Sequence, residues 1–304
     1  MGARELVMER SKRAPLAKTF ALETPILRIN TFHSSSLSSF VASLPALLAL
    51  RESFPGARLS CFVRSPYLSL MEHFRACDEA YERPGGGVPR QAALMARLHA
   101  GEPDLAISFS QGANAMLLLW STHAVRRVGF VPSPFEAFLT HRLPKRGSLS
   151  SYLALELIET VGAFPRGGRV HDFLDVPHST FESLRARLPF DYESFVLVPF
   201  DAPWKSAERE EWMRAVLEMR ASWPVVVFGG RAGEWKEVAQ SHATYPLHVE
   251  KDGNALTLLA LIRTARVIVG PANGATDLAR LDGCTTLRVT PTDAYRETLR
   301  TLGL

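Results

Sequence analysis

The amino-acid sequence predicts an α/β protein with two Rossmann-like domains that face a cleft. Its 304 residues are enough for two domains of about 150 residues that each bury a core. Short β-rich apolar runs alternate with longer helical patterns, as in parallel sheets covered by helices. This alternation restarts after the Pro- and Gly-rich stretch Phe164–Arg169, which is the best candidate for a linker.

In the first half, a helix expected over Leu37–Phe54 separates the first two strands, and its apolar residues fit one helical face. Pro45 within it indicates either a kink or a helix start at that point. A second helical run covers Tyr152–Val161. The strands of this half are expected at Ile26–Asn30, Leu59–Arg64 and Leu105–Phe109.

The second half repeats the pattern, with helices expected at Glu208–Arg220, at Ala255–Thr264 and from about Leu278 onward. Its strands are expected at Phe195–Pro199, Pro224–Gly229, Arg266–Gly270 and Thr286–Val289. We therefore expect a basic N-terminal arm (1–22), an N-terminal domain (23–165), a linker (166–176) and a C-terminal domain (177–304). Ligands of such folds bind between the domains, outside the carboxyl ends of the strands.

Composition excludes several classes of protein. The chain is 46% hydrophobic and 22% charged, with a net charge of +4 and no basic tract. This balance excludes general disorder and favours an anionic ligand or a membrane surface; nucleic acid is not an expected partner. The longest apolar runs, such as Ala113–Trp120, are far shorter than the roughly 18 residues of a membrane span.

The cysteines and the first residues indicate a cytoplasmic protein. Cys61, Cys77 and Cys284 are scattered and form no C-x-x-C pair, which is typical of reduced thiols. The first twenty residues mix basic side chains with glutamates and contain no apolar core, so a secretory signal is not expected.

Trp204 and Lys205 lie in a loop between an expected strand and a helix. Free N–H groups at the helix start, together with the charge of Lys205, suit a diphosphate. The alternative is a solvated lysine that merely precedes a helix. The local pattern alone favours that alternative.

The next strand leads into a glycine-rich loop that contains Gly230 and ends at Glu234. Glycines permit close approach of the backbone to a ligand, and Glu234 is a candidate acceptor for ribose hydroxyls. Alternatively, Glu234 is a first-turn helix carboxylate that the helix dipole stabilises.

A third loop contains Asn273, Gly274 and Asp277. Asn273 is either a helix N-cap or part of a second set of groups around the same diphosphate. Because the carboxyl ends of parallel strands meet at one edge, all three loops are expected to open there.

The hydroxyl-rich loop from Thr31 to Ser39 is expected either to bind a polar ligand in the cleft or to be flexible and capped by serine. His33 is the candidate base in this loop, although a loop histidine is more often only solvated. The sequence offers no carboxylate pair of a two-acid hydrolase here, and its nine histidines show no metal-ligand spacing.

Several segments agree in order and spacing with one family and cover roughly Pro25–Asp293. Trp204-Lys205 is followed by Trp212, seven residues after the lysine. The other segments are ILRIN (26–30), SLPALLALRESFPGARL (43–59), PDLAISF (103–109), RRVGF (126–130), VVVFGGRAGE (225–234), ALTLLALIRTARVIVG (255–270) and VTPTDA (289–294). In this respect the chain resembles the ADP-heptose:lipopolysaccharide heptosyltransferases, glycosyltransferase family nine, as a divergent member.

The chain departs from that family at its catalytic positions. The family's Gly-Asp pair, whose aspartate looks like the acceptor-activating base, is replaced by Ser38 and Ser39. A serine hydroxyl does not act as a base near neutral pH without help. The family's Asp-(Ser/Thr)-Gly-Pro-x-His becomes Ala272–Asp277, so an anion that repels diphosphate is expected in place of the histidine.

The resemblance implies the GT-B glycosyltransferase fold and an inverting, metal-independent transfer of a sugar from an ADP-heptose-like nucleotide-diphospho-sugar. The acceptor would be lipopolysaccharide or another glycan or lipid-linked molecule, at the inner face of a bacterial inner membrane. The nucleotide sugar is a co-substrate, and no cofactor is implied. The altered catalytic positions leave a second hypothesis, a catalytically impaired homologue that binds a sugar, a nucleotide or a protein partner.

Overall fold

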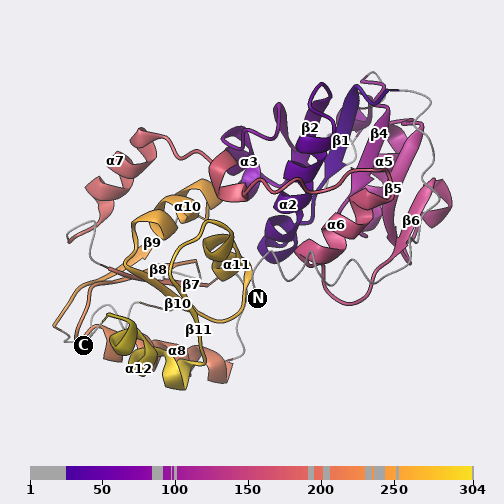
Figure 1. Ribbon diagram of the computed structural model, residues 1–304. Coiled ribbons are helices and arrows are strands. Elements are labelled where there is room, and N and C mark those ends of the chain that lie inside the picture. Colours follow the sequence, from indigo (N-terminus) through magenta and orange to yellow (C-terminus); the bar gives the residue numbers. More distant parts are fainter. Residues whose placement is uncertain are drawn as a thin grey trace.

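The computed structural model describes residues 25–83, 92–96, 98, 101–190, 195–200, 206–229, 235, 244–250 and 253–302. These residues form two separate, fully parallel sheets (Figure 1). The first sheet has the order β3-β2-β1-β4-β5-β6 and the second the order β11-β10-β7-β8-β9. In both, the strand order reverses beside the first strand of the sheet, which is the Rossmann arrangement. The α/β class with two Rossmann-like halves is therefore confirmed.

In the first half, the three expected strands are confirmed within two residues at each end. The apolar pattern did not predict β3 and β6, which are short edge strands without apolar alternation, or β5 between β4 and β6. The strands are β1 (Arg28–Phe32), β2 (Arg58–Val63), β3 (Glu79–Glu82), β4 (Leu105–Ser108), β5 (Arg126–Val131) and β6 (His141–Pro144). The helices are α2 (Leu37–Ser53), α3 (Ser65–Glu72), α5 (Ala113–Ser121) and α6 (Ser151–Glu159), with short 3-10 turns η1 (Glu136–Phe138) and η2 (Val170–Phe173).

In the second half the predicted elements occur in the predicted order, and the helix placed near Leu278 begins earlier, at Gly274. The strand Leu247–Glu250 and the helices His178–Arg187 and Pro291–Leu302 were not predicted. The strands are β7 (Val196–Pro199), β8 (Val225–Phe228), β9 (Leu247–Glu250), β10 (Val267–Gly270) and β11 (Thr286–Arg288). The helices are α7 (His178–Arg187), α8 (Ser206–Met219), α10 (Ala255–Thr264), α11 (Gly274–Leu281) and α12 (Pro291–Leu302).

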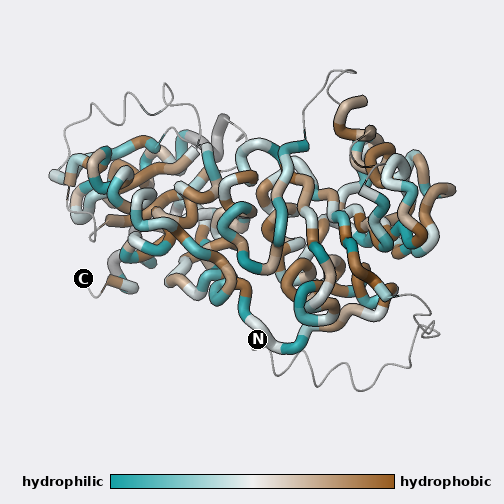
Figure 2. The backbone as a smooth tube through the Cα atoms, turned by 90° about the horizontal axis from the view of Figure 1, so that it is seen from above, coloured by the Kyte–Doolittle hydropathy of each residue, from teal (hydrophilic) through white to brown (hydrophobic). Residues whose placement is uncertain are grey.

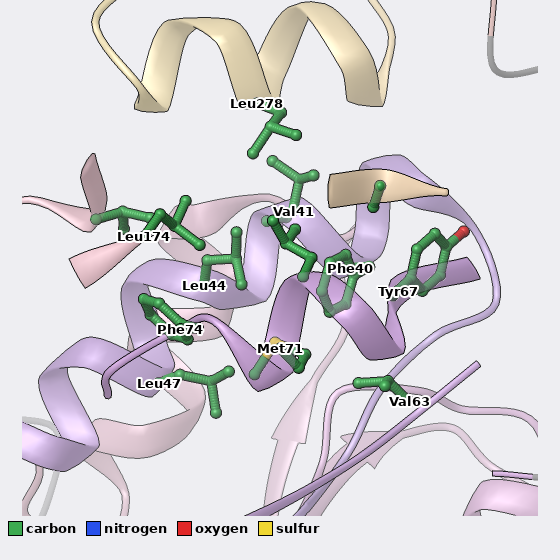
Figure 3. Close-up of a cluster of buried hydrophobic side chains, with 14 of the residues drawn as sticks. Phe40, Val41, Leu44, Leu47, Val63, Tyr67, Met71, Phe74, Leu174 and Leu278 are labelled. Carbon is green, nitrogen blue, oxygen red and sulfur yellow. The ribbon is translucent and has the colours of Figure 1, made fainter. Parts of the chain in front are cut away.

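One apolar core runs through both halves. On the inner side, α2 packs against α6 and α11, and α3 packs against α10. Val41 of α2 and Leu278 of α11 belong to the same buried cluster and face each other (Figure 3). The outer face of the first sheet packs on α5, and that of the second on α8 and α12. Viewed from above, the halves lie side by side, and apolar stretches recur along the chain in both (Figure 2).

Helix α2 differs from the expectation of one apolar face. Its central residues from Phe40 to Leu50 are buried except for the partly exposed Pro45, because the helix is enclosed by neighbouring elements on several sides. A helix that is apolar all round is typical of such a position. It runs through Pro45, so a helix start at that residue is wrong.

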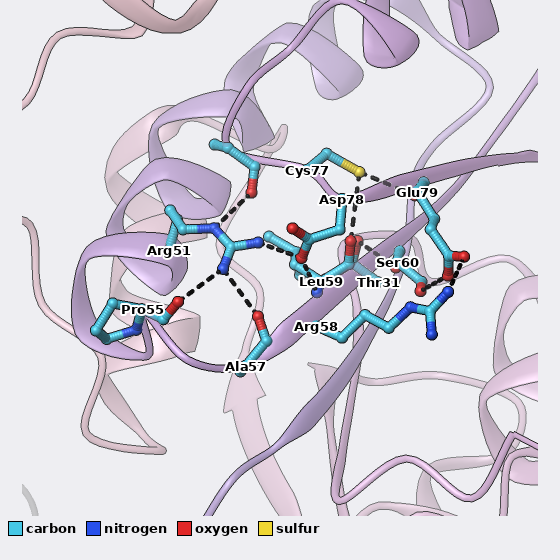
Figure 4. Close-up of polar contacts among 11 residues, drawn as sticks. Thr31, Arg51, Pro55, Ala57, Arg58, Leu59, Ser60, Cys77, Asp78 and Glu79 are labelled. Atoms are coloured by element: carbon cyan, nitrogen blue, oxygen red, sulfur yellow. Dashed lines mark hydrogen bonds and ion pairs between the residues drawn. The ribbon is translucent and has the colours of Figure 1, made fainter.

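Arg51, in the last turn of α2, holds the amino-terminal ends of β2 and β3 together (Figure 4). Its guanidinium donates to the carbonyls of Ala76 (3.1 Å) and Ala57 (2.8 Å) and pairs with Asp78. The Asp78 carboxylate also accepts a hydrogen bond from the Leu59 amide (2.7 Å). These contacts fix the register at the edge opposite the candidate site.

Residues 166–176, the expected linker, contact both halves. The Gly168 amide donates to Glu52 of α2 (3.0 Å), and His171 contacts Asp282 at the end of α11 (3.1 Å between Nδ1 and Oδ1). Arg263 of α10 donates to the Leu174 carbonyl (2.9 Å). The chain thus crosses between the sheets along their common core; the exact domain boundary stays a prediction. Within the described part of the chain, no helix is both long and apolar enough to cross a membrane.

Candidate functional site at the facing sheet edges

The loop after β10 is held in place at the carboxyl edge of the second sheet. Asn273 and Thr276 form a capping box: Asn273 Oδ1 accepts from the Thr276 amide (2.9 Å), and Thr276 Oγ1 accepts from the Asn273 amide (3.1 Å). Asn273 Nδ2 also donates to the carbonyl of Pro199, the last residue of β7 (3.0 Å). The N-cap interpretation of Asn273 is therefore confirmed, and it explains why α11 begins at Gly274.

Gly274 brings the starts of α11 and α2 together. A Cβ added at Gly274 would lie 2.4 Å from the Ser38 nitrogen and 2.6 Å from the Leu37 carbonyl carbon. Real Cβ atoms do not approach so closely, so only glycine permits this contact. The partly buried Ser39 follows directly, and its amide donates to the Ser36 hydroxyl that caps α2 (3.4 Å). The N-termini of two helices, one from each half of the molecule, therefore lie in contact.

Asp277 is not the unpaired anion that the sequence suggested. It lies in the first turn of α11 and forms an ion pair with Arg288, the last residue of β11. Both side chains are partly exposed, 44% for Asp277 and 29% for Arg288. Arg288 therefore offsets the charge of Asp277, and the expected repulsion of a diphosphate is weaker than the sequence alone indicated.

The prediction that His33 acts as a base in a solvated loop is wrong, because the His33 side chain is fully buried. Ser43 Oγ donates its only proton to the Phe40 carbonyl (2.6 Å), so it accepts a hydrogen bond from His33 Nδ1 (2.8 Å). The other ring nitrogen, His33 Nε2, then accepts from Thr31 Oγ1 (3.0 Å). Burial, and then the charge of Arg83, lower the pKa of His33 from its ordinary value to about 3. The imidazole is therefore neutral, hydrogen-bonded at both nitrogens and out of reach of an acceptor.

Four of the predicted donor-site residues, Trp204, Lys205, Gly230 and Glu234, lie outside the described residues. The strand ends that lead into their loops are described. Gly229 has φ +83°, and a Cβ there would lie 1.9 Å from the Phe200 carbonyl oxygen. The ends of β7 and β8 therefore approach each other closely at the same sheet edge as Asn273.

A cavity of about 450 Å³ lies at the carboxyl edge of the first sheet, and sequence analysis missed it. Its polar lining consists of Ser35, Arg64, Arg83, Ser110, the Gly112 backbone and Asn114. Arg64 directly follows β2, and Arg83 directly follows β3. A residue that directly follows a parallel strand is a candidate for ligand binding, and this signal could have identified both arginines. It did not, because the predicted strand included Arg64 and because β3 was not predicted.

A second, smaller cavity of about 330 Å³ lies between α7 and α10 and contains none of the predicted site residues. Hydroxyl groups of Ser179, Thr180, Ser183 and Thr257 line it. Its one arginine, Arg187, already pairs with Glu250 (3.0 Å). The cavity is therefore polar, but its charges are paired.

Sequence comparison finds no matching family model and no similar curated protein. Comparison of structures finds similar folds over most of the chain. A family 9 glycosyl transferase from Veillonella parvula has a TM-score of 0.71 at 15% identity, covering 88% of this chain and 82% of its own. The E. coli ADP-heptose LPS heptosyltransferase II has a TM-score of 0.71 at 13% identity, covering 91% and 98%.

An E. coli heptosyltransferase crystallised with ADP-2-deoxy-2-fluoro heptose has a TM-score of 0.64 at 15% identity, covering 86% of this chain and 87% of its own. At such identities the likeness shows a shared fold. The chain therefore has the GT-B arrangement of two Rossmann-like domains, and its chemistry has to be argued from its own residues.

Proposed function

We propose that the protein is a glycosyltransferase that moves a sugar from a nucleotide-diphospho-sugar to an acceptor. The observation that carries this proposal is the contact between Gly274 and Ser38. In this contact the capped N-terminus of α11 lies directly beside the start of α2. We assign the first to the donor and the second to the acceptor. The likeness in fold to a heptosyltransferase obtained with ADP-2-deoxy-2-fluoro heptose supports a nucleotide-diphospho-sugar as the donor.

The start of α11 has the character of a diphosphate site. Backbone amides at a helix N-terminus stabilise anions. Arg288 adds a guanidinium beside this turn, and Lys205 is proposed as a second cation. Together they would stabilise the negative charge that develops on the departing diphosphate, without a metal ion. Gly230 and Glu234 are proposed to contact the nucleotide, with Trp204 next to Lys205.

On the acceptor side, Ser39 is proposed to hydrogen-bond the attacking hydroxyl. The reaction would invert the anomeric carbon, because one direct displacement carries the sugar from donor to acceptor. We propose an ADP-heptose-like donor and a glycan or lipid-linked acceptor such as lipopolysaccharide, at the inner face of the bacterial inner membrane. Since His33 is buried, the described residues supply no assigned general base.

The test is to incubate the full chain with a panel of nucleotide sugars and possible acceptors, and to measure free nucleoside diphosphate and thermal stabilisation separately. We expect stabilisation by one nucleotide class and slow release of its diphosphate. Lys205→Ala should weaken nucleotide diphosphate binding clearly, whereas Lys145→Ala, at the end of the first sheet, should not. Absence of stabilisation by any nucleotide sugar would contradict the proposal.

A second candidate is a catalytically impaired homologue that binds a sugar, a nucleotide or a protein partner. The burial of His33 favours it, because this imidazole is out of reach of an acceptor hydroxyl. Stabilisation without turnover would support this candidate. The triple variant Ser39→Asp, Ala272→Asp and Asp277→His should then gain turnover, since a positioned base typically contributes about a hundredfold or more. Loss of an existing activity in that variant would instead support a working enzyme with its own site.

A further inference from the structure

Two arginines share the cavity at the carboxyl edge of the first sheet. Arg64 and Arg83 follow neighbouring strands, and the Arg83 amide donates to the Val63 carbonyl (2.6 Å), so the two residues emerge side by side. Arg83 is only 9% exposed, although it lines the cavity. Its guanidinium is thus withdrawn from solvent and belongs to the cavity wall.

The positive charge of this pair is not neutralised within the described residues. Arg83 Nε is buried without a hydrogen-bond partner, and no described carboxylate forms an ion pair with Arg64 or Arg83. Burial, and then the neighbouring charge of Arg64, lower the pKa of Arg83. Nearly all buried arginines are paired, because leaving such a group without a partner is costly. An unpaired one that faces a cavity indicates that a ligand supplies the partner.

The start of α5 adds hydrogen-bond donors to the same cavity. Gly112 is the N-cap of this nine-residue helix and has no side chain to satisfy its first amides. In the described part of the chain, nothing accepts from the Ala113 and Asn114 amides, and both residues line the cavity. The helix dipole therefore acts in the same direction as the two arginines.

We propose that this cavity binds an oxyanion, the phosphate or carboxylate group of a small polar ligand, between Arg64, Arg83 and the first turn of α5. A volume of about 450 Å³ exceeds that of an anion alone and leaves room for a sugar-sized body. Ser35 and Ser110 also line the cavity, and Ser110 Oγ, which accepts from the Gly112 amide (3.2 Å), can still donate to that body. The binding site stands on its own geometry. Only the identity of the ligand rests on the proposed function: if the protein transfers a sugar, the ligand in this cavity is the acceptor.

Neutral His33 fits this assignment. Burial, and then the charge of Arg83, lower the pKa of His33, so His33 adds no third positive charge beside the two arginines. An arginine that served only to pack its aliphatic stem would not require an uncapped helix, a second arginine and a cavity at the same place. The three features together distinguish a binding site from a packing role.

The experiment is calorimetric titration of the full-length protein with inorganic phosphate, a hexose phosphate and a hexuronate, at constant ionic strength set by sodium chloride. We expect saturable binding that is tighter for one of the two sugar anions, which identifies the anion as phosphate or carboxylate. Arg83→Met and Arg64→Gln should each weaken binding at least tenfold. Arg142→Gln, on the exposed edge strand β6, is the matched control and should bind as the parent does.

Melting temperatures without ligand give an independent readout. Arg83→Met should melt at the same or a higher temperature than the parent, because it removes an unpaired buried charge. The proposal is overturned if no anion binds saturably, or if both arginine variants bind as the parent does. A lowered melting temperature of Arg83→Met with unchanged anion binding would assign Arg83 to packing. Nucleotide-sugar binding is measured on the same variants. If the parent binds a nucleotide sugar but no anion in this cavity, the cavity proposal fails while the proposed function stands.

Discussion

Gly274 lies against the backbone of Ser38, so closely that a Cβ at Gly274 would come within 2.4 Å of the Ser38 nitrogen. This contact joins the first turn of α11 to the first turn of α2, and thereby sets the separation of the two sheet edges at the candidate site. The two helix starts can lie this close together only because Gly274 has no side chain.

Gly274→Ala should therefore force the two helix starts apart. Overpacking of a well-packed contact typically costs about 1–3 kcal/mol, and we expect a loss of unfolding free energy of that order, measured by urea denaturation. Nucleotide-sugar binding should weaken as well, because the loop before α11, which we propose binds the donor, moves. Gly56→Ala is the control, since a Cβ there meets nothing within 4 Å. Equal stability of the two variants would show that the contact is looser than described.

Leu278 tests whether the two halves unfold together. It is fully buried in the cluster that also contains Val41 of the other half. Leu278→Ala should lower the unfolding free energy by about 2–5 kcal/mol, and calorimetry should still show one transition, at a lower temperature. Leu278→Met conserves the volume and should cost less than about 1.5 kcal/mol. Two separate transitions in the parent protein would contradict a shared core.

Asp277 and Arg288 allow a test of the proposed diphosphate site. Asp277→Asn should release Arg288 toward a bound diphosphate and tighten nucleoside diphosphate binding roughly tenfold, or about 1.4 kcal/mol. Arg288→Gln should weaken it. Stability should change by less than about 1 kcal/mol in both, because the pair is partly exposed. Titration calorimetry at low and high salt measures the effect, and equal affinities of the two variants would exclude this turn as the diphosphate site.

His33 makes the stability of the protein dependent on pH. Its pKa is about 3 in the folded protein and near 6.5 in an unfolded chain, so the unfolded state binds the proton more readily. The contribution of His33 is complete above about pH 6.5 and is lost as the pH falls toward 3, by up to about 1.4 kcal/mol per pH unit. His33→Gln should flatten the stability profile between those values, in denaturation measured from pH 4 to 8. An unchanged slope would mean that His33 is accessible to protons in the folded state.

The sequence alone determined those features that depend on neighbours along the chain. The apolar run Phe195–Pro199, followed by a helical pattern, indicated a covered parallel strand, because side chains on both faces of such a strand are apolar. An N-cap at Asn273 was one of its two interpretations, because the residue lies between an expected strand and an expected helix. Both signals are local, and both agree with the structure.

Only the tertiary structure decided how the candidate site is built. The sequence places His33 in a loop and so suggests that it is exposed. In the structure it is buried and hydrogen-bonded to Thr31 and Ser43. Arg288 reaches Asp277 from the end of another strand, and Arg64 and Arg83 meet because β2 and β3 are neighbours. Pairing of charges, burial and the meeting of strand ends depend on residues distant in the sequence, and no local pattern records them.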